Sequence, residues 1–285
     1  MMSEMVYGKV IELFLVNGTA DSLVIAELSN WNGQAIKIPR IEITECDRDE
    51  IKGPGVYFLF CKEEDEEKDA VYIGESENLK LRLGQHMQDY SAGKEKYYWN
   101  TAVLFTGTGL NKALIRYLED RLVKMAKEAN RYTVLTKNTY GKTVLKESAQ
   151  ATMEEFLDKI KVLINAMGYK VLEPVISSSE NNQQILYLTK EDAEAKGVVT
   201  AEGFVVFKGA KLNAKTSEKS LRPKAAAYRN KMMNSKKVID LHTTENLLFS
   251  SSSAAADFVL GFSASGPREW KDKNGTSLKE LNIDS

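Results

Sequence analysis

The sequence predicts an α+β protein with two parts, a small sheet with helices packed on it and a second α+β domain. Three observations predict this class. Short apolar runs bounded by turn residues alternate with longer helical patterns over the first part of the chain. The 285 residues suffice for about two domains. A composition of 43% hydrophobic and 28% charged residues supports packed cores.

The first 50 residues read as a β-rich segment. Apolar runs near residues 10–15 and 24–26 lie on either side of the turn-forming pair Asn17-Gly18. Asn32-Gly33 is a second hairpin signal. We therefore expect antiparallel hairpins here.

The next segment, residues 51–145, follows the order strand, strand, helix, strand, helix. Its first strand, VYFLFC, comes directly after the chain-breaking Gly53-Pro54-Gly55. Ser76 is the expected N-cap of the first helix. The other predicted elements are a strand at 70–73, a helix at 77–90, a strand at 101–107 and a helix at 111–129. This order indicates a small sheet with helices packed on it.

A C-terminal α+β domain is expected over residues 146–285. It opens with an amphipathic helix near 154–169, followed by a polar linker at 176–184. A strand is expected at 203–210, and SSSSAAADFVLG reads as a serine cap followed by a helix. Trp270 is expected in the core of this domain.

The charge distribution gives no overall attraction to nucleic acid or membranes, because the net charge is -1. A nucleic-acid partner must therefore be met by a local patch. From Lys208 to Lys237 the chain has ten Lys and Arg residues and one acid, with Phe207 directly before the stretch and Tyr228 within it. This stretch is either a nucleic-acid-binding patch or a solvated lysine-rich loop. The candidate contacts are Lys208, Lys211, Lys215, Arg222, Lys224, Arg229 and Lys231.

A cytoplasmic location fits the remaining bulk features. Cys46 and Cys61 lack metal or redox spacing and fit a reducing compartment. The sequence has no apolar run of 18 residues and no secretory signal, so a membrane is not an expected partner. Nothing in the sequence specifies an oligomeric state.

Three polar residues fall on the apolar stripes of the two helices expected at 77–90 and 111–129. Arg82 and His86 lie on the first, and Glu119 lies on the second. Burying an ionised group without a partner costs several kcal/mol, so these groups should be paired or should border a cleft. Periodicity leaves two interpretations open. One is an Arg82–Glu119 salt bridge with a core histidine nearby, and the other is a polar site completed by tyrosines from the strands.

The spacing of particular residues resembles the GIY-YIG nuclease family over residues 53–140. Gly55-Val56-Tyr57 and Tyr72-Ile73-Gly74 resemble its two tyrosine motifs. The matching residues after them are Asn78-Leu79, Arg82-Leu83, His86, Glu119 and Asn138. The N-terminal stretch ELSNWNGQAIKIPR and the C-terminal AAADFVLG and WK resemble a bacterial subset of the family, in which an uncharacterised domain closes the chain.

The resemblance implies a three-stranded antiparallel sheet flanked by helices. It also implies an endonuclease that hydrolyses phosphodiester bonds of nucleic acid, with DNA as the expected substrate, one divalent ion, Mg²⁺ or Mn²⁺, and no organic cofactor. The alternatives are a catalytically silent nucleic-acid-binding or scaffold protein, and a nuclease of single strands or RNA.

The resemblance assigns a role to each matching residue. Glu119 would hold the metal, and Arg82 would bind the scissile phosphate. Tyr57 would act as the base, or its relay, toward the attacking water. Tyr72 would position or share that role, and His86 would accept the tyrosine proton.

Two further positions are expected to support the site, and one departs from the family pattern. Gly74 allows a turn and close backbone approach, while Asn138 is either functional or shapes a loop. Many relatives have a basic residue directly after the second motif, but this chain has Glu75. A carboxylate there either repels phosphate or points outward.

Overall fold

The computed structural model describes residues 7–61, 69–137, 143–176, 184–217 and 219–282. The chain divides into two compact units, Met1–Pro174 and Val175–Ser285. The α+β class predicted from the sequence is confirmed, because each unit combines helices with its own sheet.

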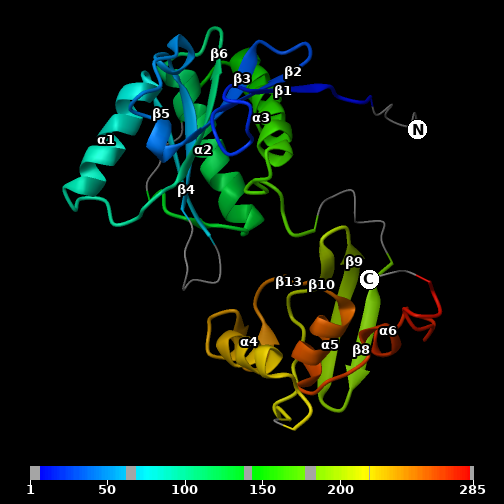
Figure 1. The fold of residues 1–285 in the computed structure, drawn as a ribbon. Helices are drawn as coiled ribbons and strands as arrows, with labels where there is room; N and C mark the ends of the chain where they lie inside the picture. The colour runs from blue at the N-terminus through cyan, green and yellow to red at the C-terminus, as the bar shows by residue number, and fades with distance from the viewer. Residues whose placement is uncertain (1–6, 62–68, 138–142, 177–183, 218, 283–285) are drawn as a thin grey trace. The chain divides into compact units, whose positions relative to one another are not determined.

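The first unit contains a seven-stranded sheet in the order β1-β2-β3-β6-β4-β5-β7 (Figure 1). Neighbouring strands are antiparallel except β5 and β7, which are parallel. The three strands predicted for residues 51–145 are the neighbours β6, β4 and β5, and the N-terminal hairpins extend their sheet through β3. The strands are β1 (Ile11–Leu15), β2 (Val24–Leu28), β3 (Gly33–Pro39), β4 (Gly55–Cys61), β5 (Ala70–Ser76), β6 (Thr101–Gly107) and β7 (Thr133–Val134).

Both faces of this sheet are covered, which explains why β4 is apolar throughout. Alternate side chains of a strand point to opposite faces. Val56, Phe58 and Phe60 belong to the core that also includes residues of α2 (Lys112–Ala129) and α3 (Glu147–Ala166). Their neighbours Tyr57, Leu59 and Cys61 belong to the core that includes residues of α1 (Leu79–Ser91). In Figure 1, α1 accordingly lies on one side of β4 and β5, with α2 on the other.

The first helix begins two residues later than predicted. Asn78, not Ser76, is its N-cap, and the Asn78 side chain accepts a hydrogen bond from the Leu81 amide at 3.0 Å. Ser76 ends β5, and its hydroxyl bonds to the backbone of Asn78. Both residues are good capping types, so sequence preference alone did not separate them.

The division between the units lies after Pro174, whereas the sequence placed a boundary between residues 145 and 146. The helix α3 buries its apolar stripe in the core of the first unit. Three of its residues, Phe156, Ile160 and Leu163, are at most 6% exposed there. Phe156 also packs edge-on against Trp31, with ring centroids 4.9 Å apart.

The second unit has a four-stranded antiparallel sheet in the order β13-β10-β9-β8 and a two-stranded ribbon of β11 and β12. Its apolar core includes Trp270, which is 0% exposed and donates to the Ser252 carbonyl. The elements are β8 (Leu186–Lys190), β9 (Ala193–Thr200), β10 (Gly203–Val206), α4 (Pro223–Met233), β11 (Val238–Ile239), β12 (His242–Thr243), β13 (Leu247–Phe249), α5 (Ser252–Leu260) and α6 (Gly266–Glu269).

Two predictions for this unit can be compared directly. The predicted serine cap is confirmed, because Ser251 accepts from the Ala254 amide at the start of α5. The strand expected at 203–210 ends at Val206. Residues 177–183 of the predicted linker lie outside the described residues. Among the helices that the structure describes, none is both long and apolar enough to cross a membrane.

Candidate active site

A pocket of about 650 Å³ opens at the edge of the first unit's sheet, beside the second half of β5. The short strand β7 pairs only with Ala70 and Val71, at the start of β5. Further along β5, Tyr72 belongs to the core on the α1 side, while Ile73 belongs to the core that includes α2. The pocket therefore collects side chains from both faces of the sheet. It is lined by Tyr57, Tyr72, Glu75, Ser76, Glu77, Asn78, Leu81, Arg82, Gln85, Lys112 and Glu119.

Tyr57 is buried on the side of the pocket that α1 covers, and two side chains of α1 contact its hydroxyl. Its hydroxyl lies 2.9 Å from His86 Nε2 and accepts a hydrogen bond from Arg82 Nε at 3.2 Å. Arg82 also donates to Gln85 Oε1 at 2.7 Å. The spacing of Arg82 and His86, one helical turn apart on α1, places both groups over the same phenol.

His86 is fully buried and is held from behind by Glu95. Its Nδ1 lies 2.6 Å from Glu95 Oε1. Burial, and then the charge of Arg82, lower the pKa of His86 to about 3, so the imidazole is neutral near pH 7. With Glu95 ionised, its carboxylate accepts Nδ1–H, and Nε2 is left to accept the Tyr57 hydroxyl proton.

Three tyrosines stack in a row at this side of the pocket. The rings of Tyr57 and Tyr72 have centroids 6.1 Å apart, and those of Tyr72 and Tyr97 are 5.8 Å apart. Burial raises the pKa of Tyr57 and of Tyr72 above the ordinary value of a phenol, and Arg82 opposes this in both cases. Tyr57 is therefore protonated in the free protein near pH 7.

Gly74 lies directly across from Tyr57 in the register of β4 and β5. A Cβ atom on Gly74 would overlap the Tyr57 phenol and would lie 3.0 Å from Tyr72 Cε1. The absence of a side chain at this position therefore leaves the space that the Tyr57 hydroxyl occupies. Gly74 lies within β5 and not in a turn, and the Tyr57 side chain, not another backbone segment, approaches it.

Glu119 reaches the same pocket from α2. It is 5% exposed, and its Oε2 atom is buried with no hydrogen-bond partner. Burial, and then the charge of Glu75, raise the pKa of Glu119 to about 7. No ion pair joins Arg82 to Glu119 among the described residues; Arg82 instead bonds to Tyr57 and Gln85. The salt-bridge interpretation of these two residues is therefore wrong.

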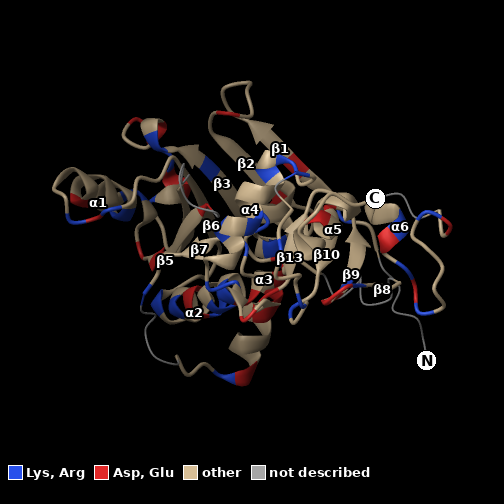
Figure 2. Cartoon of the chain, turned by 90° about the horizontal axis from the view of Figure 1, so that it is seen from below, with Lys and Arg blue, Asp and Glu red and all other residues tan. Residues whose placement is uncertain are grey.

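Glu75 neither points outward nor stands alone. It is 8% exposed and lines the pocket, where Lys112 donates to both of its oxygens at 2.8 and 2.9 Å. Arg116 Nε lies 3.8 Å from Glu75 Oε1. The cation that the family pattern places after the second motif is absent, but Lys112 brings one to the pocket from α2. Lys and Arg residues recur along this helix (Figure 2).

Sequence reasoning missed four polar groups of this neighbourhood. Lys112 is the first residue of α2, and Gln85 is exposed on α1, so neither interrupts the apolar stripe of its helix. Glu95 and Tyr97 lie between α1 and β6, in a segment without helical or strand periodicity. Asn138 lies outside the described residues.

The basic residues predicted to bind nucleic acid divide by burial. Arg229 is 0% exposed, and its guanidinium donates to the backbone carbonyls of Phe258 and Asn213. Arg229 is therefore a structural residue that cannot contact a nucleic acid, and its assignment was wrong. The other six, Lys208, Lys211, Lys215, Arg222, Lys224 and Lys231, are exposed.

Comparison with known proteins identifies a domain in each unit. Residues 53–133 match the family model of the GIY-YIG catalytic domain, which is a nuclease family. Residues 186–282 match DUF4357, a domain of unknown function. No curated protein and no solved structure matches the chain. The chain therefore contains a GIY-YIG domain at residues 53–133 and a DUF4357 domain at residues 186–282.

Proposed function

We propose that this protein is a metal-dependent endonuclease of the cytoplasm that hydrolyses phosphodiester bonds of DNA. One observation carries the proposal. Tyr57, Tyr72, Arg82 and Glu119 line a single pocket although they come from four different elements, and His86 contacts Tyr57 from behind. A buried base relay, a guanidinium and a free carboxylate are the groups that phosphodiester hydrolysis requires.

The residues present fit a divalent cation. The buried Oε2 of Glu119 has no partner, which is costly unless a ligand satisfies it. No three His, Cys, Asp or Glu side chains gather as ligands within the described part of the chain. One carboxylate is nevertheless sufficient, because Mg²⁺ commonly completes its shell with waters and substrate phosphate. When bound, Mg²⁺ or Mn²⁺ would stabilise the leaving oxygen as a Lewis acid.

Tyr57 would relay a proton rather than start as a phenolate. The attacking water gives its proton to the Tyr57 oxygen while the Tyr57 proton passes to His86 Nε2. Arg82 Nε, 3.2 Å from that oxygen, stabilises the negative charge that develops on it. Glu95 stabilises the imidazolium that forms. Burial lowers the pKa of His86 and so favours the neutral imidazole, which is the state that this relay needs.

Arg82 and Lys112 would bind the phosphate from opposite sides of the pocket. Arg82 comes from α1 and Lys112 from α2, and both line the pocket. Glu75 holds Lys112 in place. The guanidinium suits recognition of phosphate oxygens, and it would stabilise the charge that builds on them during the reaction.

The exposed basic residues of the C-terminal unit would hold the nucleic acid while the GIY-YIG domain cuts it. A protein with a net charge of -1 needs such local cations to bind a polyanion. Binding is expected to weaken steeply as the salt concentration rises.

A magnesium-dependent cleavage assay tests the proposal. Supercoiled plasmid, single-stranded DNA and RNA are incubated with wild type and with Glu119→Ala, each with Mg²⁺ or Mn²⁺. We expect wild type to nick the plasmid and Glu119→Ala to be inactive, while Glu27→Ala, an exposed glutamate on β2, stays active.

Other outcomes distinguish the alternatives. Cleavage of single strands or RNA without plasmid nicking would make the protein a nuclease of those substrates. Binding without cleavage of any of the three would identify a scaffold protein and would reject the endonuclease.

A further inference from the structure

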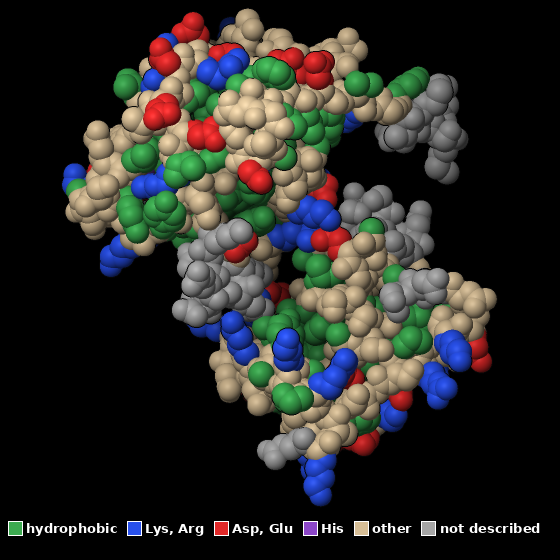
Figure 3. All heavy atoms as spheres, viewed as in Figure 1, with side chains coloured by type: hydrophobic (Ala, Val, Ile, Leu, Met, Phe, Trp, Pro, Cys, Tyr) green, Lys and Arg blue, Asp and Glu red, His purple; other side chains and the backbone are tan. Residues whose placement is uncertain are grey.

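The C-terminal unit has a groove of about 720 Å³ that the proposed active site does not use. It lies between α4 on one side and β13 and α5 on the other. Its lining combines aromatic rings, small residues and two cations. A hydrophobic core would lack the cations, and a basic surface would lack the aromatic rings. In this part of the unit, Figure 3 shows hydrophobic side chains with Lys and Arg side chains around them.

The floor of the groove is aromatic. Tyr228, Phe249 and Phe258 pack together, with ring centroids 5.9 Å, 6.0 Å and 5.1 Å apart. The two phenylalanines are almost fully buried, while Tyr228 is only half-buried. Ala225 and Ala254 also line the groove, and their short side chains leave room for a flat group beside Tyr228.

The rim of the groove is built to receive an anion. Arg222 and Lys224 lie there at the N-terminus of α4, where no side chain caps the free amides. The buried carboxylate of Asp257 holds Arg222 Nη2 at 3.3 Å. The Arg222 side chain is still 70% exposed, so the guanidinium is positioned and open to solvent.

We propose that this groove binds an unpaired nucleotide of a nucleic-acid strand, with its base against Tyr228 and its phosphate at Arg222, Lys224 and the start of α4. A base offers the flat apolar face that the floor fits, and the adjacent phosphate offers the charge that the rim fits. Paired bases inside a duplex do not expose that face. The proposal deepens the proposed function, because it makes single strands the form of nucleic acid that the DUF4357 domain prefers.

Fluorescence anisotropy on the full chain tests this proposal without requiring cleavage. The probes are a labelled single strand of about 16 nucleotides and a duplex of the same length, in buffer with EDTA. We expect wild type to bind the single strand more tightly than the duplex. Tyr228→Leu should weaken single-strand binding about tenfold with little effect on the duplex, whereas Tyr228→Phe, which keeps the ring, should bind like wild type.

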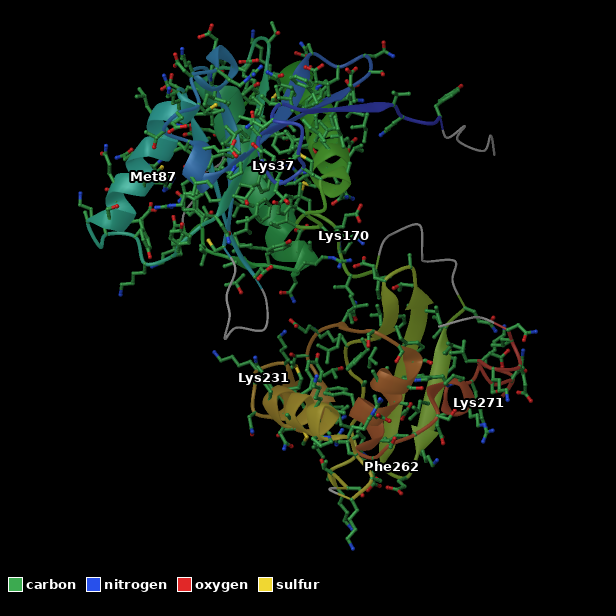
Figure 4. All side chains as sticks on the ribbon, in the orientation of Figure 1. Lys37, Met87, Lys170, Lys231, Phe262 and Lys271 are labelled. Carbon is green, nitrogen blue, oxygen red and sulfur yellow. The ribbon has the colours of Figure 1, made fainter. Side chains whose placement is uncertain are left out.

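The charged rim is tested by the salt dependence of the same binding. Arg222→Gln/Lys224→Gln should make the negative slope of log K against log salt shallower by about 1.4. Lys271→Gln/Lys273→Gln is the matched control, because both side chains are exposed and Lys271 lies on the opposite side of this unit from Lys231 of α4 (Figure 4). That pair should leave the slope unchanged.

Four results would overturn the proposal. They are no measurable binding of the single strand, an equal loss for single strand and duplex in Tyr228→Leu, an equal change of slope in the two charge variants, and normal strand binding in every groove variant. Because cleavage plays no part, an inactive catalytic pocket would leave these expectations untouched. A groove that instead docks a protein would show normal strand binding in every groove variant.

Discussion

The Tyr57 hydroxyl has two neighbours with complementary chemical roles. His86 Nε2 can take its proton, and Arg82 Nε can stabilise the oxygen that remains. A phenol that is buried in this way is a poor base by itself, because burial raises its pKa. The chemistry therefore depends on His86 staying neutral and correctly oriented by Glu95.

The neutral state of His86 should be visible in the pH dependence of stability. Its folded pKa of about 3 lies below the ordinary value of 6.5, so the folded state binds fewer protons between these values. This contribution is complete above about pH 6.5 and is lost as the pH falls toward 3. Urea unfolding at about pH 7.5 and pH 5 should show wild type losing about 2 kcal/mol more than His86→Gln does.

The second histidine of the chain provides the control. His242 is exposed in the C-terminal unit, so His242→Gln should lose stability with falling pH as wild type does. A pH dependence in His86→Gln equal to that of wild type would contradict a buried neutral imidazole.

Most polar side chains of the candidate active site could be predicted from the sequence. Arg82, His86 and Glu119 stood out because they interrupt apolar stripes, and Tyr57 and Tyr72 because of their motif spacing. Glu95, which orients His86, follows α1 in an irregular segment. No periodicity distinguishes such a residue. Its role is seen only in the folded structure, where Glu95 contacts His86 on α1.

Among the elements, the strand β5 is important for the position of Tyr57. Its Gly74 leaves room for the Tyr57 phenol, which comes from the neighbouring strand β4. Gly74→Ala should push the Tyr57 ring away, since the new Cβ overlaps it. We expect a loss of about 1–3 kcal/mol in stability, measured by urea unfolding, and a cleavage rate at least tenfold lower.

Gly84 on α1 is the matched control for this substitution. A Cβ at Gly84 meets nothing within 4 Å, and alanine in a helix interior is favoured by about 0.5–1 kcal/mol. Gly84→Ala should therefore be at least as stable as wild type and equally active. Full activity in Gly74→Ala would show that the Tyr57 position is not critical.

Elements with strong periodicity were predictable, and short irregular ones were not. The strand at 101–107 and the end of α2 at Ala129 agree with the sequence reading. The hairpin of β8 and β9 was not anticipated. In β9, exposed Glu194 and Lys196 alternate with buried Ala193 and Ala195, and alanine is a weak strand signal.

At the scale of the whole molecule, α3 decides where the first unit ends. Its apolar stripe completes the core on the α2 face of the sheet. Burying each such side chain contributes about 1.5–3 kcal/mol, against about 5–15 kcal/mol for the stability of a whole domain. The buried residues of α3 are Met153, Phe156, Leu157, Ile160, Leu163 and Ile164.

Truncation separates the two possible boundaries. A fragment of residues 1–174 should unfold cooperatively in urea, followed by circular dichroism. A fragment of residues 1–145 should not, because it exposes the core that α3 covers. Cooperative unfolding of the shorter fragment with unchanged stability would contradict this account.

The sequence could not place this boundary because an amphipathic helix does not say which sheet it covers. Judged by its sequence pattern alone, the apolar stripe of α3 could pack against the core of the first unit or that of the second. Only the packing of Phe156 against Trp31 and the sheet shows which unit it joins. Both units were nevertheless expected to be α+β, because that prediction depends only on the types of elements.

The proposed mechanism depends on the claim that the Tyr57 hydroxyl passes the proton of the attacking water to His86. The most direct test is the single-turnover cleavage rate of Tyr57→Phe, which removes one oxygen and keeps the ring. Tyr132→Phe, in a ring that packs on Phe60 away from the pocket, is the control. We predict a rate at least about 100-fold lower for Tyr57→Phe and a normal rate for the control, with both variants folded. A rate for folded Tyr57→Phe equal to that of wild type would contradict the claim.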